Sequence, residues 1–424
     1  MLGRRAADPG MRPACAPLAL AAVILPGMLG LCALAAQEES NPGGRFPGKP
    51  APEWDRVFAR RKGWTGADGC YSIDLGDSRT LWLYSDTWVG TVAKGKHAEG
   101  SRLVNNSIGI HRTGKNGAPP DYGKLDFAWG EPGEDGHPRA WLEPDLPAQD
   151  NAPPGKKTDK TWYWLLDGCM TETPRGEKKL LIFLMHMGRK KEGGKGVFNF
   201  RMVGGALAVV SNPLEEISQW KVRQAVNPHS RRSGINDISW ATALYLADKD
   251  GPGEPGTLYI YGIRDVKGLN KHVVLAKAPA SRADDFSTWR FFAGGSWSAK
   301  SSDAVRITDE AVNEHTVESI VYKGKRRLLL VESQPVFGKH ILIRTAERPE
   351  GPWSGLKKVF LVENLEKGKH KRFTYAGKGH THLSAPGELL ISYVINSHNF
   401  WDMVGDASIY RPRFIRLPLG AIFD

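Results

Sequence analysis

The chain has 424 residues, with 58 Lys and Arg against 46 Asp and Glu, which gives a formal net charge of +12. Its basic runs are short and loop-like, and no nucleic-acid-binding motif accompanies them, so we do not expect a nucleic-acid partner. Only Cys70 and Cys169 of its four cysteines lie beyond the first 36 residues, which is too few for a disulfide framework, so a chain of this length must be stabilised by a hydrophobic core.

The first 36 residues have the features of a secretory signal peptide. Three arginines precede an apolar stretch from about Ala16 to Ala36 that ends in small residues. No other stretch approaches the roughly 18 apolar residues that a membrane-spanning helix needs. We therefore expect cleavage near Ala36, a flexible linker over residues 37–55, and a secreted or periplasmic, monomeric protein with no membrane partner.

From Trp64 onward the sequence consists of short alternating or β-branched runs bounded by Gly, Pro, Asp and Asn, a pattern typical of an all-β protein. The runs group into repeating units of four, and three units carry a Trp before the fourth run, at Trp220, Trp289 and Trp353. Four strands at this period are typical of a propeller blade. We predict a single five-bladed β-propeller over residues 56–424, with four-stranded antiparallel blades around a central funnel.

In chain order, the expected first strands of the five blades are Ala67–Ile73, Trp162–Met170, Ser239–Leu246, His315–Tyr322 and His380–Ser384. A stretch from about 130 to 160 is rich in Gly, Pro and Asp and has no periodicity, so we expect a long loop insertion there. The last blade lacks a Trp-marked fourth strand. We therefore expect the chain ends to meet in it, with residues 407–410 and 414–417 pairing beside a strand near Val57.

The predicted first strands line the funnel, and their starts carry polar residues. Carboxylates from different blades around one axis are suited to glycoside hydrolysis, which needs an acid and a base or nucleophile beside the scissile bond. The candidate catalytic residues are Asp68, Asp86, Asp237, Glu314 and Glu318. The candidate substrate-binding residues are Asp167, Asn105, Asn106, Trp88, Trp240, His315, His380 and His382.

Asp68 and Asp86 form the most specific pair. If the turn between their strands has an odd number of residues, so that Leu75 faces Arg79, Asp68 lies opposite Asp86 with Cβ atoms about 5 Å apart. Two carboxyls this close would have their pKa values pushed apart, which favours one proton donor and one anion. An even turn would place them on opposite faces, and both residues could instead simply cap turns.

Each of these polar side chains has a functional and a structural interpretation. On a strand, the alternate spacing of His380 and His382 puts both imidazoles on one side, where they could hold a metal, contact a sugar or serve as hydrogen-bonded funnel residues. Asn105 and Asn106 could bind a polyol or make a turn. We expect no required cofactor, and a structural metal ion on the propeller axis is an open alternative.

The aromatic residues and cysteines are equally ambiguous. Trp88 and Trp240 lie near predicted strand ends, where an aromatic face could stack on a sugar ring or pack between blades. Cys70 and Cys169 follow the same Asp-Gly dipeptide in neighbouring blades. They could form a disulfide or remain two buried thiols.

The first blade also resembles a known family. Its motifs are Gly66–Ile73, Leu81–Gly90 and Asn105–Ser107. They resemble the signature of secreted propellers called domain of unknown function 4185, some members of which are endo-acting D-arabinan hydrolases. Arg344–Ser354 is similar to a segment common in five-bladed propellers of glycoside hydrolase family 43. The resemblance implies that Asp68 and Asp86 are the acid/base pair, although Tyr84 to Asp86 departs from the Gly-Asp-Thr form of the family.

Together these observations predict an exported glycoside hydrolase that cleaves a furanosyl, arabinan-like or related polysaccharide or oligosaccharide by carboxylate acid/base catalysis. The alternative is a non-catalytic propeller that binds carbohydrate or a cell-surface polymer. Two funnel carboxyls about 5 to 10 Å apart beside an open cleft would favour hydrolysis. A funnel filled by side chains, with Asp68 and Asp86 pointing apart, would favour binding.

Overall fold

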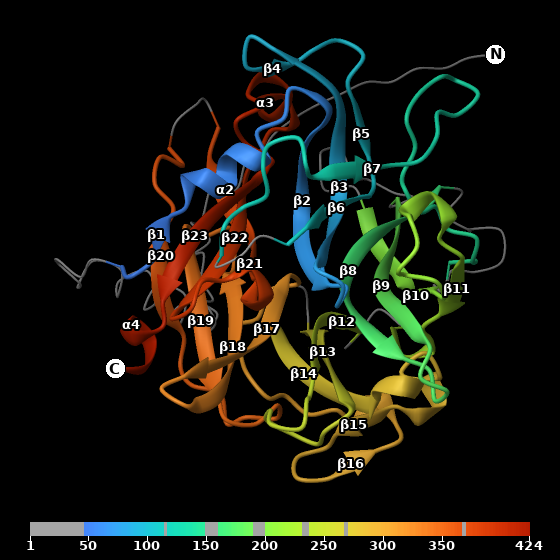
Figure 1. Ribbon diagram of the computed structural model, residues 1–424, viewed down its shortest axis with the longest axis vertical. Helices are drawn as coiled ribbons and strands as arrows, with labels where there is room; N and C mark the ends of the chain where they lie inside the picture. The colour runs from blue at the N-terminus through green and yellow to red at the C-terminus, as the bar shows by residue number, and fades with distance from the viewer. Residues whose placement is uncertain are drawn as a thin grey trace, which may run out of the picture. The chain divides into compact units, whose positions relative to one another are not determined.

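The computed structural model describes residues 46–113, 117–148, 160–189, 200–230, 237–266, 270–366 and 370–424. The expected signal peptide lies outside these residues. Five antiparallel sheets of four to six strands follow one another around a common axis (Figure 1), which confirms the predicted five-bladed β-propeller. None of the helices in the described ranges is long and apolar enough to cross a membrane.

Blades 1 and 2 are built outward from their first strands. Blade 1 has the order β2-β3-β6-β7, with β4 and β5 also pairing with β3, and blade 2 has the order β8-β9-β10-β11. The strands of blade 1 are β2 Lys62–Asp74, β3 Arg79–Ala93, β4 Lys96–His97, β5 Arg102–Val104, β6 Ser107–Arg112 and β7 Asp126–Ala128. Those of blade 2 are β8 Thr161–Glu172, β9 Lys178–Arg189, β10 Phe200–Val210 and β11 Val222–Val226.

Blades 3 and 4 follow the same plan, although blade 3 has a fifth strand. The strands of blade 3 are β12 Asp237–Leu246, β13 Thr257–Val266, β14 Asn270–Pro279, β15 Arg290–Phe292 and β16 Trp297–Ser298. Those of blade 4 are β17 His315–Tyr322, β18 Lys325–Ser333, β19 His340–Ala346 and β20 Lys357–Leu361. Single 3-10 turns connect strands at η1 Ile217–Gln219, η2 Pro228–Ser230, η3 Ala280–Arg282, η4 Phe286–Thr288 and η5 Ser301–Asp303.

Blade 5 contains strands from both ends of the described chain. Its strands are β21 Arg372–Gly379, β22 Glu388–Ser397, β23 Pro412–Pro418 and β1 Lys49–Pro50. The first strand β1 pairs with β23, so the ends do meet in this blade, as predicted. The closing strand is Lys49–Pro50, whereas Val57 belongs to helix α2, Pro52–Val57. The fold therefore includes residues that we expected in the linker.

Two further expectations for blade 5 were wrong. The innermost strand is β21, because residues 380–384 leave the sheet and form the 3-10 turn η6, Thr381–Leu383. Residues 407–410 form no strand, and the short helix α3, Phe400–Gly405, precedes them. Another short helix, α4 Gly420–Phe423, ends the chain.

The five innermost strands form a closed ring, in which β2, β8, β12, β17 and β21 each contact the next and β21 contacts β2. Within the described residues, four of them carry a mid-strand register shift: β2 near Asp68, β8 after Leu165, β12 after Trp240 and β21 after Tyr375. Such bulges re-aim side chains and are common beside active sites. Here they fall where the chain approaches the axis.

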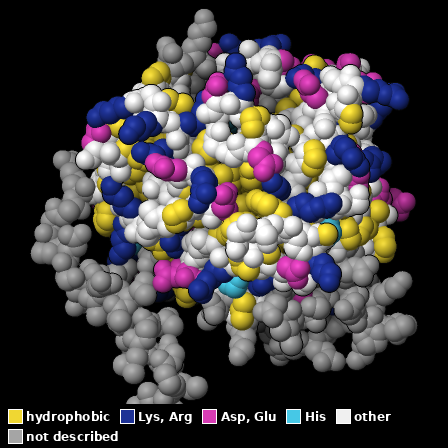
Figure 2. Space-filling view, turned by 90° about the horizontal axis from the view of Figure 1, so that it is seen from below, with side chains coloured by type: hydrophobic (Ala, Val, Ile, Leu, Met, Phe, Trp, Pro, Cys, Tyr) yellow, Lys and Arg dark blue, Asp and Glu magenta, His cyan; other side chains and the backbone are white. Residues whose placement is uncertain are grey.

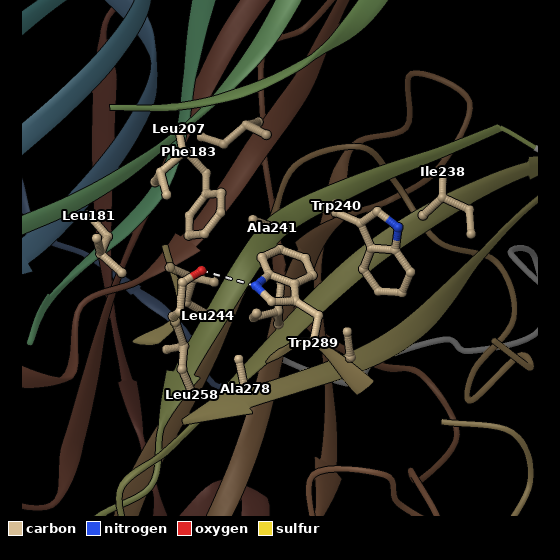
Figure 3. Packing of buried hydrophobic residues seen from close by; sticks show 14 of the residues in the cluster. Leu181, Phe183, Leu207, Ile238, Trp240, Ala241, Leu244, Leu258, Ala278 and Trp289 are labelled. Carbon is tan, nitrogen blue, oxygen red and sulfur yellow. Dashed lines mark hydrogen bonds between the residues drawn. The ribbon is translucent and has the colours of Figure 1, made fainter. Parts of the chain in front are cut away.

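Hydrophobic side chains fill the spaces between blades. Figure 3 shows Trp289 of blade 3 packed close to Phe183 of blade 2, with Trp240 on the other side of Trp289. The indole Nε1 of Trp289 donates a hydrogen bond to the Ala283 carbonyl oxygen at 3.0 Å. An indole whose N–H is hydrogen-bonded inside an apolar cluster buries a large apolar area and is held in one orientation. These contacts therefore hold neighbouring blades together.

The basic excess is dispersed on the face seen in Figure 2, where Lys and Arg side chains alternate with Asp and Glu. Many surface charges are paired, as in Lys178 with Glu172 at 2.7 Å and Arg282 with Asp285 at 2.6 Å. Exposed pairs of this kind contribute little to stability. The stability of the fold therefore depends mainly on the apolar clusters between blades.

Helix α2 anchors the short closing strand. Trp54 of α2 is completely buried, and its ring packs against Trp82 and Phe414. Its Nε1 donates to the Gly117 carbonyl oxygen at 3.2 Å. Because β1 has only two residues, this tryptophan supplies much of the contact between the N-terminal segment and blades 1 and 5.

We expect Trp54→Ala to lower the free energy of unfolding by about 3 to 5 kcal/mol, because it leaves a cavity at the closure. Urea denaturation measures the change. The control is Trp401→Ala, since Trp401 is 70% exposed and its removal should change stability by about 0.5 kcal/mol or less. Equal losses in the two variants would contradict this account of closure.

Candidate active site

The turn of blade 1 sets the register of Asp68 and Asp86. The amide of Leu75 donates to the Arg79 carbonyl oxygen at 2.9 Å, so the turn between them is odd. The same register places Ala67 opposite Thr87, and the bulge then begins at Asp68. Asp68 and Asp86 therefore lie next to each other across the ladder, and the charge of Asp86 acts directly on Asp68.

Asp68 is held by two tyrosines from blade 5. Its Oδ2 accepts hydrogen bonds from Tyr375 Oη at 2.7 Å and Tyr410 Oη at 2.8 Å. Its Oδ1 is buried and has no hydrogen-bond partner among the described residues. Burial, followed by the charges of Asp86 and Glu314, raises the pKa of Asp68 well above its usual range. Since Oδ2 already accepts two hydrogens, Oδ1 is the oxygen suited to carry the proton.

Asp86 has a different environment. Its Oδ1 accepts hydrogen bonds from Trp164 Nε1 at 2.9 Å and Asn105 Nδ2 at 3.1 Å. Burial raises the pKa of Asp86 to about 6, while these two donors favour its anion. The two environments differ, so Asp68 is the carboxyl that holds its proton more firmly and Asp86 is the one whose anion is stabilised by donors.

A glycine of the first-blade motif makes this arrangement possible. A Cβ on Gly66 would lie 2.5 Å from the Tyr410 carbonyl oxygen, closer than any side chain allows. Only glycine lets β2 pass the Tyr410 backbone at this distance. Gly66 therefore brings the Tyr410 hydroxyl within reach of Asp68.

Three further predicted carboxylates lie around the axis. Asp167 accepts backbone hydrogen bonds from Gly168 and Leu244, both at 2.8 Å, and burial raises its pKa to about 7. Glu318 accepts from the backbone amide of Thr381 at 3.1 Å, and burial raises its pKa too. The charge of Glu318 acts on Asp167, and that of Glu314 acts on Asp68. Blades 1, 2, 4 and 5 thus each contribute polar groups to one cluster, and the contribution of blade 5 is its two tyrosines.

Asp237 is the remaining catalytic candidate. It begins β12, where it faces Asp265 of β13 across the ladder, and it is 5% exposed. Its position is at the start of the strand rather than at the bulge. Its catalytic role stays a prediction.

The histidines belong to the wall of the propeller. Both ring nitrogens of His380 are engaged, Nδ1 with Ser72 Oγ at 2.7 Å and Nε2 with Ser392 Oγ at 2.8 Å. His382 lies in η6, so the two imidazoles do not share the face of a strand. His315 is fully buried, and burial lowers its pKa to about 3. In the described part of the chain, no group of three or more potential ligands could hold a metal ion.

Three other substrate-binding candidates have structural contacts. Asn106 is buried and binds both the amide and the carbonyl of Leu142, at 2.8 and 2.9 Å, which anchors the described part of the long loop. Trp88 is 4% exposed and stacks on His97 at 4.5 Å. Trp240 is 2% exposed and packs between blades. Asn105 alone of this group contacts the carboxylate pair.

Cys70 and Cys169, the two cysteines in the described part of the chain, are free thiols. Cys70 is buried, and burial raises the pKa of each thiol to about 12. The disulfide alternative is thus not realised, and neither thiol is activated as a nucleophile.

The sequence interpretation missed three residues of the site: Trp164, Tyr375 and Tyr410. Trp164 lies in a correctly predicted strand, and its spacing from the Asp-Gly dipeptide of blade 2 was the available signal. Tyr375 was missed because the innermost strand of blade 5 was assigned too late in the chain. Tyr410 follows α3 in a loop, where no periodicity indicates its direction.

We expect Asp86→Asn to be more stable than the native protein at pH 7.5. Between the ordinary Asp pKa and the folded value of about 6, the native state binds more protons than the unfolded chain, so stability is lost as pH rises through this window. Asparagine does not ionise, and its Oδ1 can still accept from Trp164 and Asn105. Because Asp86 is partly exposed, we expect a gain of about 1 to 2 kcal/mol.

Urea denaturation at pH 4 and pH 7.5 measures this gain, which should nearly vanish at pH 4. Asp121→Asn is the control, because the side chain of Asp121 is 75% exposed. A variant that is less stable than the native protein at both pH values would show that Asp86 has a purely structural role.

Comparisons with known proteins support the fold. A candidate hydrolase from Bacteroides ovatus ATCC 8483 has a similar structure, with 19% identity, a TM-score of 0.65 and coverage of 89% of this chain and 92% of that one. An alpha-L-arabinofuranosidase from Podospora anserina matches with 11% identity, a TM-score of 0.43 and coverage of 84% and 91%. No curated protein matches.

The family comparison covers almost all of the propeller. Residues 52–418 match the model of domain of unknown function 5005. The resemblance of the first-blade motifs to domain of unknown function 4185 stays a prediction. On the match over residues 52–418, the chain belongs to the family called domain of unknown function 5005.

Proposed function

We propose that this protein is an exported glycoside hydrolase that cleaves a furanosyl, arabinan-like or related polysaccharide. The observation that carries the proposal is the pair Asp68 and Asp86, two neighbouring carboxyls on adjacent strands whose pKa values are both raised and whose hydrogen-bond partners differ. Pairs of carboxyls with strongly shifted pKa values are common at catalytic sites.

Each carboxyl has one role in the proposed reaction. Asp68 gives its proton to the glycosidic oxygen as the bond to the anomeric carbon breaks, a role that requires the buried Oδ1 to become accessible when the substrate binds. Ionised Asp86 acts on the other side, either as the base that takes a proton from water or as the nucleophile. Tyr375 and Tyr410 fix the orientation of Asp68, and Trp164 and Asn105 fix that of Asp86.

One observation favours the alternative of a carbohydrate-binding propeller without catalysis. Deep in the axis, Tyr71, His315 and Lys378 are at most 1% exposed, so side chains fill part of the funnel. Above such a floor, carboxylates and indoles could bind sugar hydroxyls without cleaving a bond. Substitution of the carboxyl pair distinguishes the two functions, because only catalysis requires a proton donor.

The choice of arabinan as the first substrate is supported by the first-blade motifs, whose resemblance is to propellers that include D-arabinan hydrolases. The fold-level match to the Bacteroides protein adds no information on the sugar. Related furanosyl and pyranosyl polymers therefore belong in the same experiment.

We expect the protein to release reducing sugar from at least one of a panel of arabinans, xylans and galactans. Asp68→Asn and Asp86→Asn should each lower kcat by about 10² to 10⁴-fold, as is usual for loss of an acid or base. Asp121→Asn, a substitution of an exposed carboxyl, should retain full activity.

Undiminished activity in both site variants would refute the assigned roles. Binding of a glycan without release of sugar, retained in Asp68→Asn, would establish the binding propeller instead. Isothermal titration calorimetry with the same oligosaccharides measures that binding.

A further inference from the structure

The loop between β18 and β19 presents an exposed aromatic ring. Phe337 is 44% exposed, and its neighbour Val336 is 61% exposed. Both residues have a φ of 57°, in the left-handed region. A hairpin turn with two such residues normally contains Asn and Gly, and a β-branched residue at positive φ is an outlier. Because backbone strain of this kind is concentrated at functional sites, the loop is a candidate for a functional role.

Hydrogen bonds hold this loop in one conformation. The side-chain oxygen of Gln334 accepts from the Lys339 amide at 3.2 Å and lies 2.8 Å from His340 Nδ1. The Gly338 carbonyl oxygen accepts from the Thr374 amide of β21 at 3.2 Å. The loop of blade 4 is thus attached to the innermost strand of blade 5, and the exposed ring is held at a fixed place beside that strand.

A line of aromatic contacts joins Phe337 to the carboxylate pair. Its ring lies 4.4 Å from the ring of Phe373, which lies 5.7 Å from the ring of Tyr375, measured between ring centres. The Tyr375 hydroxyl donates to Asp68 Oδ2 at 2.7 Å. The exposed ring is therefore within the length of a short oligosaccharide from Asp68.

Polar side chains follow the same path. Asn396 is partly exposed and faces Phe373 across the ladder of β21 and β22, so the two side chains lie on one face of the sheet. Its Nδ2 donates to the Tyr375 hydroxyl oxygen at 3.4 Å. His398 is exposed, and its ring lies 5.1 Å from that of Phe337. An amide and an imidazole between an exposed ring and two carboxyls are suited to binding sugar hydroxyls.

We propose that Phe337 forms a distal sugar-binding subsite: its ring stacks on a sugar residue of the same glycan chain whose scissile bond lies at Asp68 and Asp86. A ring bordered by polar groups matches the apolar face and the hydroxyls of a sugar. The substrate class is therefore a chain of several sugar residues, rather than a glycoside of a single sugar. The inference rests on the proposed function for cleavage of the chain, but the subsite itself can be measured by binding alone.

The test is isothermal titration calorimetry of the Asp68→Asn protein, with oligosaccharides of increasing length prepared from linear arabinan, xylan and galactan as probes. Affinity for one series should rise once the chain is long enough to reach Phe337. Adding Phe337→Ala should abolish this rise, with a loss of about tenfold for long chains and none for the shortest. Equal affinity of the two proteins at every chain length, or no affinity for any chain, would overturn the proposal.

Two variants in the Asp68→Asn background are controls. Val336→Asn keeps the turn, because asparagine tolerates the left-handed region, so it should raise the melting temperature and leave affinity unchanged. Tyr122→Ala removes another exposed ring, which is 61% exposed and has the Arg60 guanidinium over it at 4.4 Å, and should also leave affinity unchanged. A loss in Val336→Asn as large as in Phe337→Ala would assign the effect to the loop conformation and refute the role of the ring.

Activity separates this inference from the proposed function. If the native protein releases sugar from a polymer, Phe337→Ala alone should raise KM about tenfold and leave kcat unchanged. Sugar release with an unchanged KM would refute the subsite and retain the hydrolase. Length-dependent binding that Phe337→Ala abolishes, without sugar release by the native protein, would refute the hydrolase and retain the subsite. Self-association that Phe337→Ala abolishes, with glycan binding unchanged, would assign the ring to a contact between copies instead.

Discussion

The closed ring of five innermost strands is the constraint on which the rest of the structure depends. Each strand must both pair within its blade and face the axis, and the mid-strand bulges reconcile these requirements. Polar groups turned inward by the bulges need partners, and they find them in neighbouring blades. Asp167 of blade 2 accepts from the Leu244 amide of blade 3, and Ser72 of blade 1 meets His380 of blade 5.

This arrangement divides stability and chemistry between two regions. The apolar clusters between blades, such as the one around Trp289, stabilise the fold. The axis instead carries buried ionisable groups whose pKa values are shifted in the unfavourable direction, including Asp68 and Lys378. Groups of this kind lower stability at neutral pH, and a protein retains them where function needs them.

Much of the fold could be predicted from the sequence, because alternating runs and the regular Trp positions depend on local pattern. The innermost strand of blade 5 was misplaced, since the bulge after Tyr375 and the glycines that follow interrupt its alternation. The carboxylate pair was found because its register depends on one short turn. Tyr410 could not be found, since its hydroxyl reaches Asp68 only when blade 5 closes the ring beside blade 1. Trp88 and Trp240 were expected to contact a sugar, but both are buried in the fold. The residue type alone does not indicate whether an indole is buried or exposed.

The closing strand has a consequence for how the molecule is made. Lys49–Pro50 is synthesised early in the chain but pairs with β23, which is synthesised near the end. The N-terminal segment must therefore remain without its final partner while four complete blades and two strands of the fifth emerge, and the ring closes only at the last step. Contacts this distant in sequence make folding slow, because the loop they close is almost the whole propeller. Until then Asp68 also lacks Tyr375 and Tyr410, so the assembled site is a property of the finished chain alone.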